Sequence, residues 1–589
     1  MNRTPEGHPE SFSRGQKAAT LFGCLLGLLL GALDQTIVAT AGPAIQRALR
    51  LDPALYVWIT TSYLVASTVL VPIYGKLSDQ WGRRRVLVLG IVIFLVGSLL
   101  CGLSRDVFQL IGFRALQGVG SAALFVSAFA VIADLFPPAE RGKYQGFFGA
   151  VFALASVVGP LVGGFVTDTL GWHWVFFINL PIGAVALGFI FAKMPPLRHY
   201  ATGGAVDVLG ALALVAWVLP LLIAFSLGEA ERWASPLILG LFALTIASLV
   251  AFVFIERRSG HPLLDLRLFS IKTFRVGTLA SFISGGSFLA AVIFLPLFMV
   301  VVAGASATRA GLTTTPLTFG IVGANILSGQ LVSRFGRYRL ILLASFLWLV
   351  AAFGLMGFTL APDSSEVEVS WKMVLVGIGL GPALPLFALA IQNAVPVNQV
   401  GVATSTNTFA RQIGGTVGLA VIGAVFAGTL STKLSQNLGA LMPELPPAAA
   451  EAALAPAQGV EAGRGVDGGS GDIEPAITGI AEAFERREDE LRRILAVGTA
   501  SPACLEAADP VVRWAIELAV PPASTGEALA NLRRAERRAL SLADEAESSA
   551  KEAFTWAIAW VYRSCMALSV LGFLVTLRLP QLPLRRIRG

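Results

Sequence analysis

Three ionisable side chains that lie inside long apolar segments are the first candidates for chemistry in this sequence. They are Asp34, Arg114 and Arg411. A charged group is costly in apolar surroundings, so it is usually paired or functional there. Burial favours the neutral form of a carboxyl group and a neighbouring cation opposes it, so Asp34 could exchange protons.

Asp34 and Arg114 are predicted to lie at similar depths. In helices, Asp34 would lie about 14 Å from the end of its segment near Pro43, and Arg114 about 10 Å from the same side. The two could therefore meet across a cavity, either as a proton-responsive site or as a permanently ionised structural pair. Arg411 has no acidic neighbour in sequence, which leaves two roles open, coupling and a structural bridge between helices.

The elements that must position these residues are membrane-spanning helices. The chain has 589 residues, of which 55% are hydrophobic and 14% charged, with a mean hydropathy of +0.72. A soluble domain has about a quarter charged residues, and a membrane helix needs about 20 mostly apolar ones. Fourteen such spans are predicted, at residues 18–42, 55–75, 86–103, 107–134, 146–168, 172–192, 206–227, 236–255, 275–303, 311–333, 339–360, 372–395, 404–430 and 553–577.

The basic residues are distributed unevenly between alternate loops. One set of loops carries most of the Lys and Arg residues, which predicts by the positive-inside rule that both termini are cytoplasmic in a cell membrane. The net charge of +7 is thereby explained without nucleic acid, for which no aromatic-interleaved basic patch is present.

A motif between spans 2 and 3 recurs between spans 10 and 11. The segments 75–85 and 329–339 share Gly, Leu, Gly, Arg and Arg at identical spacing, with Asp79 replaced by Ser333. This predicts two homologous six-span halves separated by spans 7 and 8, as in many transporters.

Several motifs together make the chain similar to the major facilitator superfamily, and within it to the 14-span drug:proton antiporters. The resemblance covers nearly the whole chain except about 431–552. The motifs comprise Leu33-Asp34-x-Thr36; Gly75, Asp79, Gly82, Arg83, Arg84 and Arg85; Arg114-x2-Gln117-Gly118; Gly159, Pro160, Gly163 and Gly164; Trp172 to Gly183; and Arg411-Gln412-x-Gly414-Gly415. His173 stands where the family usually has Arg, which puts one loop contact in doubt.

The resemblance implies an all-α fold of two six-helix bundles plus two intervening helices. It implies that the motif from Gly75 to Arg85 forms a conformational latch, with plain positive-inside topology as the alternative. It also implies that the Gly159 to Gly164 motif marks an exporter. A proline and small residues allow helix 5 to bend and a neighbour to approach closely, although such residues occur in any tight bundle.

Further polar residues inside the spans are candidates for the substrate cavity, namely Tyr63, Gln117, Asn325 and Asn407. The alternative is that they form hydrogen bonds between helices. No phosphate-binding loop, nucleophile elbow or metal-ligand spacing of histidines is present, so we expect no cofactor, no metal and no enzymatic activity.

Residues 431–552 are polar and predominantly acidic, and are expected outside the cytoplasm as a flexible linker followed by two helices. Ser524 and Glu527 match a capping box for the second of these helices, which could run on into span 14. They are either a docking surface for substrate, lipid or an adaptor protein, or a spacer. The expected units are a tail 1–17, a six-helix bundle 18–192, two linker helices 193–274, a second bundle 275–430, the insertion 431–552, span 553–577 and a basic tail 578–589.

These observations favour a proton-coupled exporter of lipophilic, cationic or similar amphipathic compounds that works by alternating access in contact with membrane lipids. A lipid or glycolipid exporter on the same scaffold is the alternative. A membrane receptor or scaffold without transport is the remote one.

Overall fold

The computed structural model describes residues 12–49, 53–195, 207–228, 233–304, 314–396, 399–438 and 525–584, and these are helical with connecting loops. The helices are α1 (Arg14–Leu49), α2 (Pro53–Trp81), α3 (Arg83–Gly102), α4 (Val107–Leu135), α5 (Pro138–Leu170), α6 (Trp174–Phe177), α7 (Asn179–Lys193), α8 (Val208–Leu227), α9 (Pro236–Arg258), the 3-10 helix η2 (Leu266–Ser270), α10 (Lys272–Val301), α12 (Thr314–Phe335), α13 (Tyr338–Thr359), α14 (Glu366–Leu380), α15 (Ala383–Ala394), α16 (Val400–Leu438) and α21 (Thr525–Thr576).

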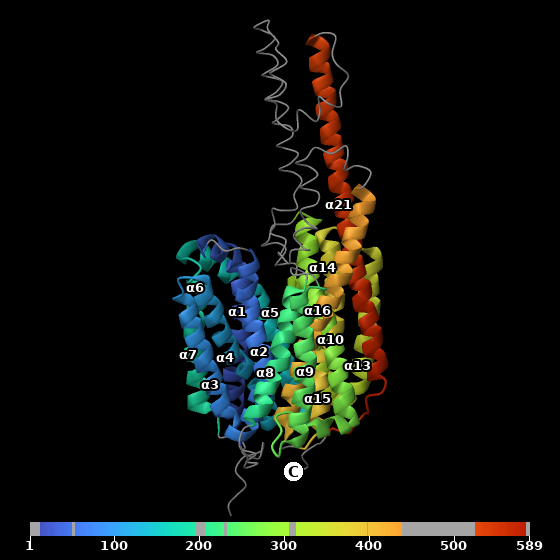
Figure 1. Ribbon diagram of the computed structural model, residues 1–589. Coiled ribbons are helices and arrows are strands. Elements are labelled where there is room, and N and C mark those ends of the chain that lie inside the picture. Colours follow the sequence, from blue (N-terminus) through green and yellow to red (C-terminus); the bar gives the residue numbers. More distant parts are fainter. Residues whose placement is uncertain are drawn as a thin grey trace, which may run out of the picture.

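The helices form two bundles, as the sequence predicts. Helices α1 to α7 make the first bundle, α10 to α21 make the second, and α8 and α9 pair beside α2 (Figure 1). Within the described ranges, 13 helical stretches are long and apolar enough to cross a membrane. The tenth predicted span corresponds to α12, which packs between α5 and α14. The fold of two six-helix bundles with two intervening helices is confirmed.

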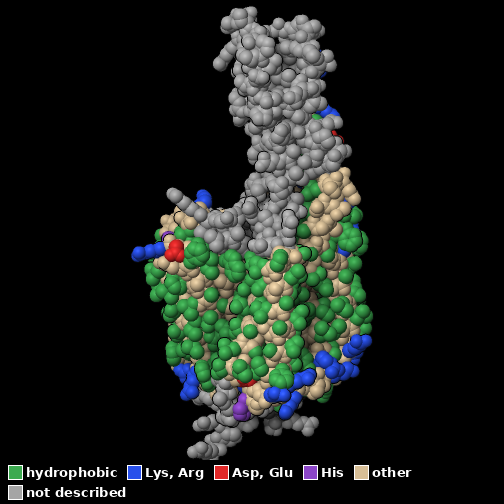
Figure 2. All heavy atoms as spheres, viewed as in Figure 1, with side chains coloured by type: hydrophobic (Ala, Val, Ile, Leu, Met, Phe, Trp, Pro, Cys, Tyr) green, Lys and Arg blue, Asp and Glu red, His purple; other side chains and the backbone are tan. Residues whose placement is uncertain are grey.

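The two ends of the bundles differ in charge. Exposed basic residues gather at the lower edge of the molecule in Figure 2, below a broad hydrophobic band. We call this the basic end, and the opposite end, from which α16 and α21 project, the rod end (Figure 1). Exposed residues at the basic end include Arg85, Lys193, Arg257, Arg334 and Arg337.

The structure explains why glycine recurs at equivalent positions of the internal repeat. Gly82 and Gly336 occupy equivalent positions and have φ angles of 89° and 70°, a region that favours glycine because it has no Cβ. Gly75 packs against Ser405 of the other bundle, and its repeat equivalent Gly329 packs against Gly142. Both copies therefore make a tight turn and let helices from opposite bundles approach closely.

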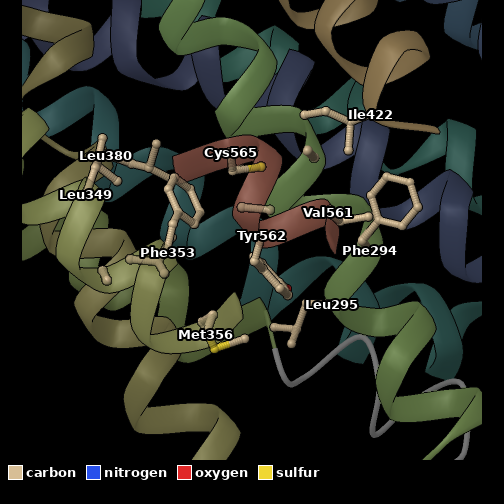
Figure 3. Close-up of a cluster of buried hydrophobic side chains, with 14 of the residues drawn as sticks. Phe294, Leu295, Leu349, Phe353, Met356, Leu380, Ile422, Val561, Tyr562 and Cys565 are labelled. Carbon is tan, nitrogen blue, oxygen red and sulfur yellow. The ribbon is translucent and has the colours of Figure 1, made fainter. Parts of the chain in front are cut away.

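The core of the second bundle is built around α21. Figure 3 shows Val561, Tyr562 and Cys565 of this helix among buried side chains of the surrounding helices. These surrounding residues come from α10, α13, α14 and α16, and include Phe294, Phe353, Met356, Leu380 and Ile422. The last span is therefore part of the bundle core even though it follows the long insertion.

Helices α16 and α21 are longer than a bilayer requires. They contain 39 and 52 residues, or roughly 58 and 78 Å at 1.5 Å per residue. Beyond the membrane they pack together through buried Leu434, Leu542 and Ala546, and Asn437 donates a hydrogen bond of 3.4 Å to the Ser549 carbonyl. The helices thus continue past the expected span limits at 430 and 553, and their projecting parts form a two-helix rod (Figure 1).

Some expectations fall outside the described residues. They are the linker and first helix expected between 439 and 524, the capping residue Ser524, most of the tail 1–17 and the last basic residues 585–589.

The segment 577–584 lies across the basic end of the second bundle and is called the strap below. The Tyr338 hydroxyl donates to the Pro580 carbonyl and accepts from the Leu582 N–H, both at 2.8 Å. Gln581 donates to the Gly336 carbonyl at 2.8 Å and accepts from the Arg339 N–H at 3.0 Å. These bonds tie the chain after α21 to the turn between α12 and α13.

We expect Tyr338→Phe to lower stability, because it leaves one N–H and one carbonyl of the strap without their partner. The loss of unfolding free energy should be about 1 to 3 kcal/mol, visible as a lower melting temperature of the purified protein. Tyr144→Phe is the matched control, since the Tyr144 ring stacks on Phe136 and its hydroxyl has no hydrogen bond within the described residues. Equal melting temperatures for the two variants would show that the hydrogen bonds of Tyr338 to the strap do not stabilise the protein.

Candidate functional site

A buried ion pair joins α1 to α4 in the first bundle. Arg114 Nη1 lies 2.6 Å from Asp34 Oδ2, and both side chains are buried. The structure therefore brings together the two residues that the sequence placed at similar depths. In surroundings of low polarity such a pair is stable only when further hydrogen bonds satisfy the remaining polar atoms.

Three buried polar side chains complete the surroundings of Asp34. Gln117 and Asn179 donate to Asp34 Oδ1 at 2.8 and 3.2 Å. Both amides also donate to Ser98 Oγ, at 3.2 and 3.0 Å, and Ser98 donates to the Phe176 carbonyl at 2.8 Å. Asp34 thus accepts hydrogen bonds at both oxygens, so neither carboxylate oxygen is left without a partner.

Helix α2 contributes the other side of the Arg114 environment. The guanidinium lies 4.3 Å from the centre of the Tyr63 ring, and its Nε donates to the Ile59 carbonyl at 3.3 Å. The Tyr63 hydroxyl is 2.7 Å from Ser121 Oγ. Tyr63 and Gln117, which the sequence suggested as cavity residues, are therefore fully buried members of this polar network.

The ion pair leaves the network without net charge. If Asp34 were protonated, Arg114 would be left without an acidic partner within the described residues. A buried unpaired cation is strongly unfavourable, so protonation would drive a rearrangement of α1 against α4.

Arg411, Asn325 and Asn407 lie elsewhere. Among the described residues, Arg411 on α16 forms no hydrogen bond or ion pair, and it is partly exposed although protein surrounds it. Asn325 packs against Gly149 of α5, and neither its amide nor Asn407 Oδ1 has a partner in the described part of the chain. The structure does not bring Arg411 to the Asp34 network.

A second buried charge cluster lies at the basic end. Arg83 pairs with Asp79 at 2.5 Å and with Asp134 of α4 at 3.0 Å. Asp79 Oδ2 accepts a 3.0 Å hydrogen bond from the N–H of Val402, in the first turn of α16 in the other bundle. The positive end of the α16 dipole favours a carboxylate there. The cluster therefore joins the two bundles.

Not every residue of this motif takes part in the contact between bundles. Arg84 is partly exposed and donates to the Phe191 carbonyl within its own bundle at 3.0 Å, and Arg85 is exposed.

The bundles also meet at the basic end through α5. Gln145 Nε2 lies 3.4 Å from Gln392 Oε1 of α15, and both side chains are buried. Gly142 contacts Gly329 of α12. Together with the Asp79 contact, these interactions close the basic end in this conformation.

The Gly159 motif lies where α5 crosses α1. Gly159 packs against Thr36, and a Cβ on Gly163 would lie 3.3 Å from the Ile37 carbonyl oxygen. The Thr36 hydroxyl donates to the Ala155 carbonyl at 2.9 Å, five residues before Pro160. Helix α5 continues through this proline. The motif therefore holds the helix that carries Asp34 against α5, whereas a Cβ on Gly164 would meet no neighbour.

Sequence reasoning missed three residues of these clusters. Ser98 and Asn179 bind around Asp34, and Asp134 pairs with Arg83. Asn179 and Asp134 are polar residues in or at the ends of apolar segments, the signal that identified Asp34. A single serine such as Ser98 gives no such signal, because serines are common in tightly packed membrane helices.

Comparisons with known proteins identify the family of the chain. Residues 24–419 match the family model of the Major Facilitator Superfamily. The chain is 38% identical over 430 residues to multidrug resistance protein 3 of Bacillus subtilis, covering 71% of this chain and 82% of that protein. It is 33% identical over 420 residues to the tetracenomycin C resistance and export protein of Streptomyces glaucescens, covering 71% and 78%.

Solved structures show the same fold. The human organic anion transporter MFSD10 superposes with a TM-score of 0.54 at 18% identity, covering 70% of this chain and 94% of that one. The proton:xylose symporter XylE superposes with a TM-score of 0.52 at 15% identity, covering 69% and 88%. With two bundles, an internal repeat at their contact and this family match over most of its length, the chain belongs to the major facilitator superfamily of membrane transporters.

Proposed function

We propose that this protein exports lipophilic drugs or similar amphipathic compounds from the cell in exchange for protons. The observation that carries the proposal is the buried Asp34–Arg114 pair, which can bind one proton and is enclosed by the first bundle. The names of its relatives as multidrug resistance and export proteins support the substrate class.

The transport cycle follows from the two charge clusters. In the present conformation the basic end is closed and Asp34 is paired with Arg114. Protonation of Asp34 from the rod end would release Arg114, and the bundles would then rock to open the basic end. Release of the proton on that side, where we place the cytoplasm by its basic residues, would restore the pair.

Helix α4 links the two clusters in this proposal. It carries Arg114 of the proton site and Asp134 of the basic-end cluster, 20 residues apart on one continuous helix. A shift of α4 that follows protonation of Asp34 would therefore also disturb the pairing of Arg83, which supports the contact of Asp79 with α16.

The same ion pair would also bind a positively charged substrate. A cationic compound can use Asp34 as its counter-ion only if Arg114 moves away, so proton and substrate would occupy the carboxylate at different stages. The partly exposed Arg411, which has no acidic partner among the described residues, would assist compounds that carry an acceptor group. Arg411 would then act in substrate binding, and not in the coupling or helix-bridging roles that its sequence position suggested.

Asp34→Asn should fold and bind dye but lose export driven by a pH gradient, because the amide keeps the shape of the carboxyl group and cannot titrate. The measurement is efflux of a cationic dye from proteoliposomes under an imposed pH gradient, with an expected loss of at least about tenfold, or 1.4 kcal/mol. Asp168→Asn, at an exposed carboxylate near the end of α5, is the control. Gradient-driven efflux by Asp34→Asn at the wild-type rate would remove Asp34 from the mechanism.

Arg83→Gln should reduce transport by weakening closure of the basic end. Without the guanidinium, Asp79 and Asp134 face each other without a cation, which is costly when both are nearly buried. The readout of closure is the yield of a short thiol cross-linker between cysteines placed at Gln145 and Gln392, in a background without Cys504. We expect a lower yield in Arg83→Gln than in wild type.

Arg84→Gln is the matched control, because Arg84 is partly exposed and bonds only within the first bundle. Its cross-linking and transport should equal those of the wild type. If both variants cross-link and transport alike, the charged cluster has no part in closure.

A further inference from the structure

Two cations that form no ion pair within the described residues lie against the same tryptophan, close to where the rod leaves the second bundle. Arg563 Cζ is 5.0 Å from the centre of a ring of Trp556 on α21, and Lys433 Nζ of α16 is 5.1 Å from it. The two charges are therefore no more than about 10 Å apart. Their mutual repulsion is unfavourable unless an anion lies near both.

Arg563 is held in place by aromatic rings and by one backbone carbonyl. Its guanidinium lies 4.7 Å from the Phe358 ring centre and 5.1 Å from that of Trp560. Its Nε donates to the Gly357 carbonyl at 2.8 Å. A Cβ on Gly357 would lie 2.9 Å from Arg563 Cγ, so glycine permits this approach. Neither terminal nitrogen of Arg563 has an acceptor within the described residues.

This cluster faces the lipid at the membrane boundary. Trp556, Trp560 and Phe358 are 41%, 38% and 65% exposed, and tryptophan is enriched at the level of lipid headgroups. Gly357 is the third-last residue of α13, which places it about 28 Å from the start of that helix at the basic end. That distance nearly spans the hydrocarbon, about 30 Å thick, so the cluster lies close to the headgroups at the rod end.

Within the described ranges, no acidic residue of the rod forms an ion pair with the cluster. Glu547 pairs with Lys551 at 2.5 Å, and within the described ranges no ion pair involves Lys433 or Arg563. The site therefore combines two positive charges, free guanidinium donors and exposed apolar rings beneath them.

We propose that Lys433, Arg563, Trp556 and Trp560 bind the headgroup of an anionic phospholipid in the leaflet at the rod end. The lipid phosphate accepts hydrogen bonds from Arg563 and Lys433, which are strong because both partners are charged. The acyl chains lie along Trp560 and Phe358. Two cations in one site select a lipid with net negative charge over a zwitterionic one.

Such a lipid bridges α16 and α21 where they leave the bundle. Its binding is independent of proton coupling, because the site lies in the second bundle, whereas Asp34 and its partners belong to the first.

The test compares lipid binding by the full-length protein. Purified protein is titrated with phosphatidylglycerol or phosphatidylcholine, and bound lipids are counted by native mass spectrometry. We expect the wild type to bind one phosphatidylglycerol at least about tenfold more tightly than phosphatidylcholine, the effect of about 1.4 kcal/mol of charge-assisted hydrogen bonding. Lys433→Gln should weaken that preference, and Lys433→Gln with Arg563→Gln should abolish it.

Arg105→Gln is the matched control, an exposed arginine at the rod end of the first bundle, and it should bind phosphatidylglycerol as the wild type does. Lys433→Gln keeps the test informative if the double variant does not fold, since Lys433 lies at the rim of the site. Equal binding of the two lipids by the wild type would overturn the proposal. An equal loss in Arg105→Gln, or an unchanged preference in Lys433→Gln and the double variant, would do the same.

Discussion

Hydrocarbon does not solvate charge, and the arrangement of this protein follows from that constraint. Asp34 is enclosed with Arg114, and Asp79 and Asp134 are enclosed with Arg83. Each of these three carboxylates is matched by a guanidinium, and Asp34 and Asp79 also accept hydrogen bonds from neighbouring helices. Arg411, Lys433 and Arg563 form no ion pair within the described residues, and they are the positions where we propose that an outside ligand supplies the missing partner.

The two buried clusters differ in what they join. The Asp34 cluster connects helices of one bundle and, within the described residues, makes no hydrogen bond or ion pair with the other bundle. The Asp79 cluster reaches the first turn of α16 and therefore opposes separation of the bundles. Helix α4 contributes to both clusters, so in the proposed cycle the displacement of one rigid helix would relate proton binding to closure without a chain of intermediate contacts.

Much of this organisation could be predicted from sequence, because a bilayer fixes helix length and the repeat fixes pairing of the halves. Apolar segments gave the spans, and depth along two of them paired Asp34 with Arg114. The polar end of α16 could not be found that way, because it is set by contacts with α21. The continuation of α21 ahead of the last span agrees with the capping pattern at Ser524 and Glu527, which predicts a helix that runs on into that span. The burial of Tyr63 and Gln117 also depends on packing, since a polar side chain in a span can face a cavity or another helix with the same sequence pattern.

Because α21 is one continuous helix, the rod moves together with the second bundle. About 40 Å of this helix extends from near Glu552 to Thr525, and the same rigid helix is packed into the core of the second bundle. A rocking of that bundle by about ten degrees would sweep the tip through roughly 7 Å. If the bundles rock as proposed, the position of the tip would differ between the two open states, well beyond the membrane surface, where a soluble molecule could contact it without entering the bilayer.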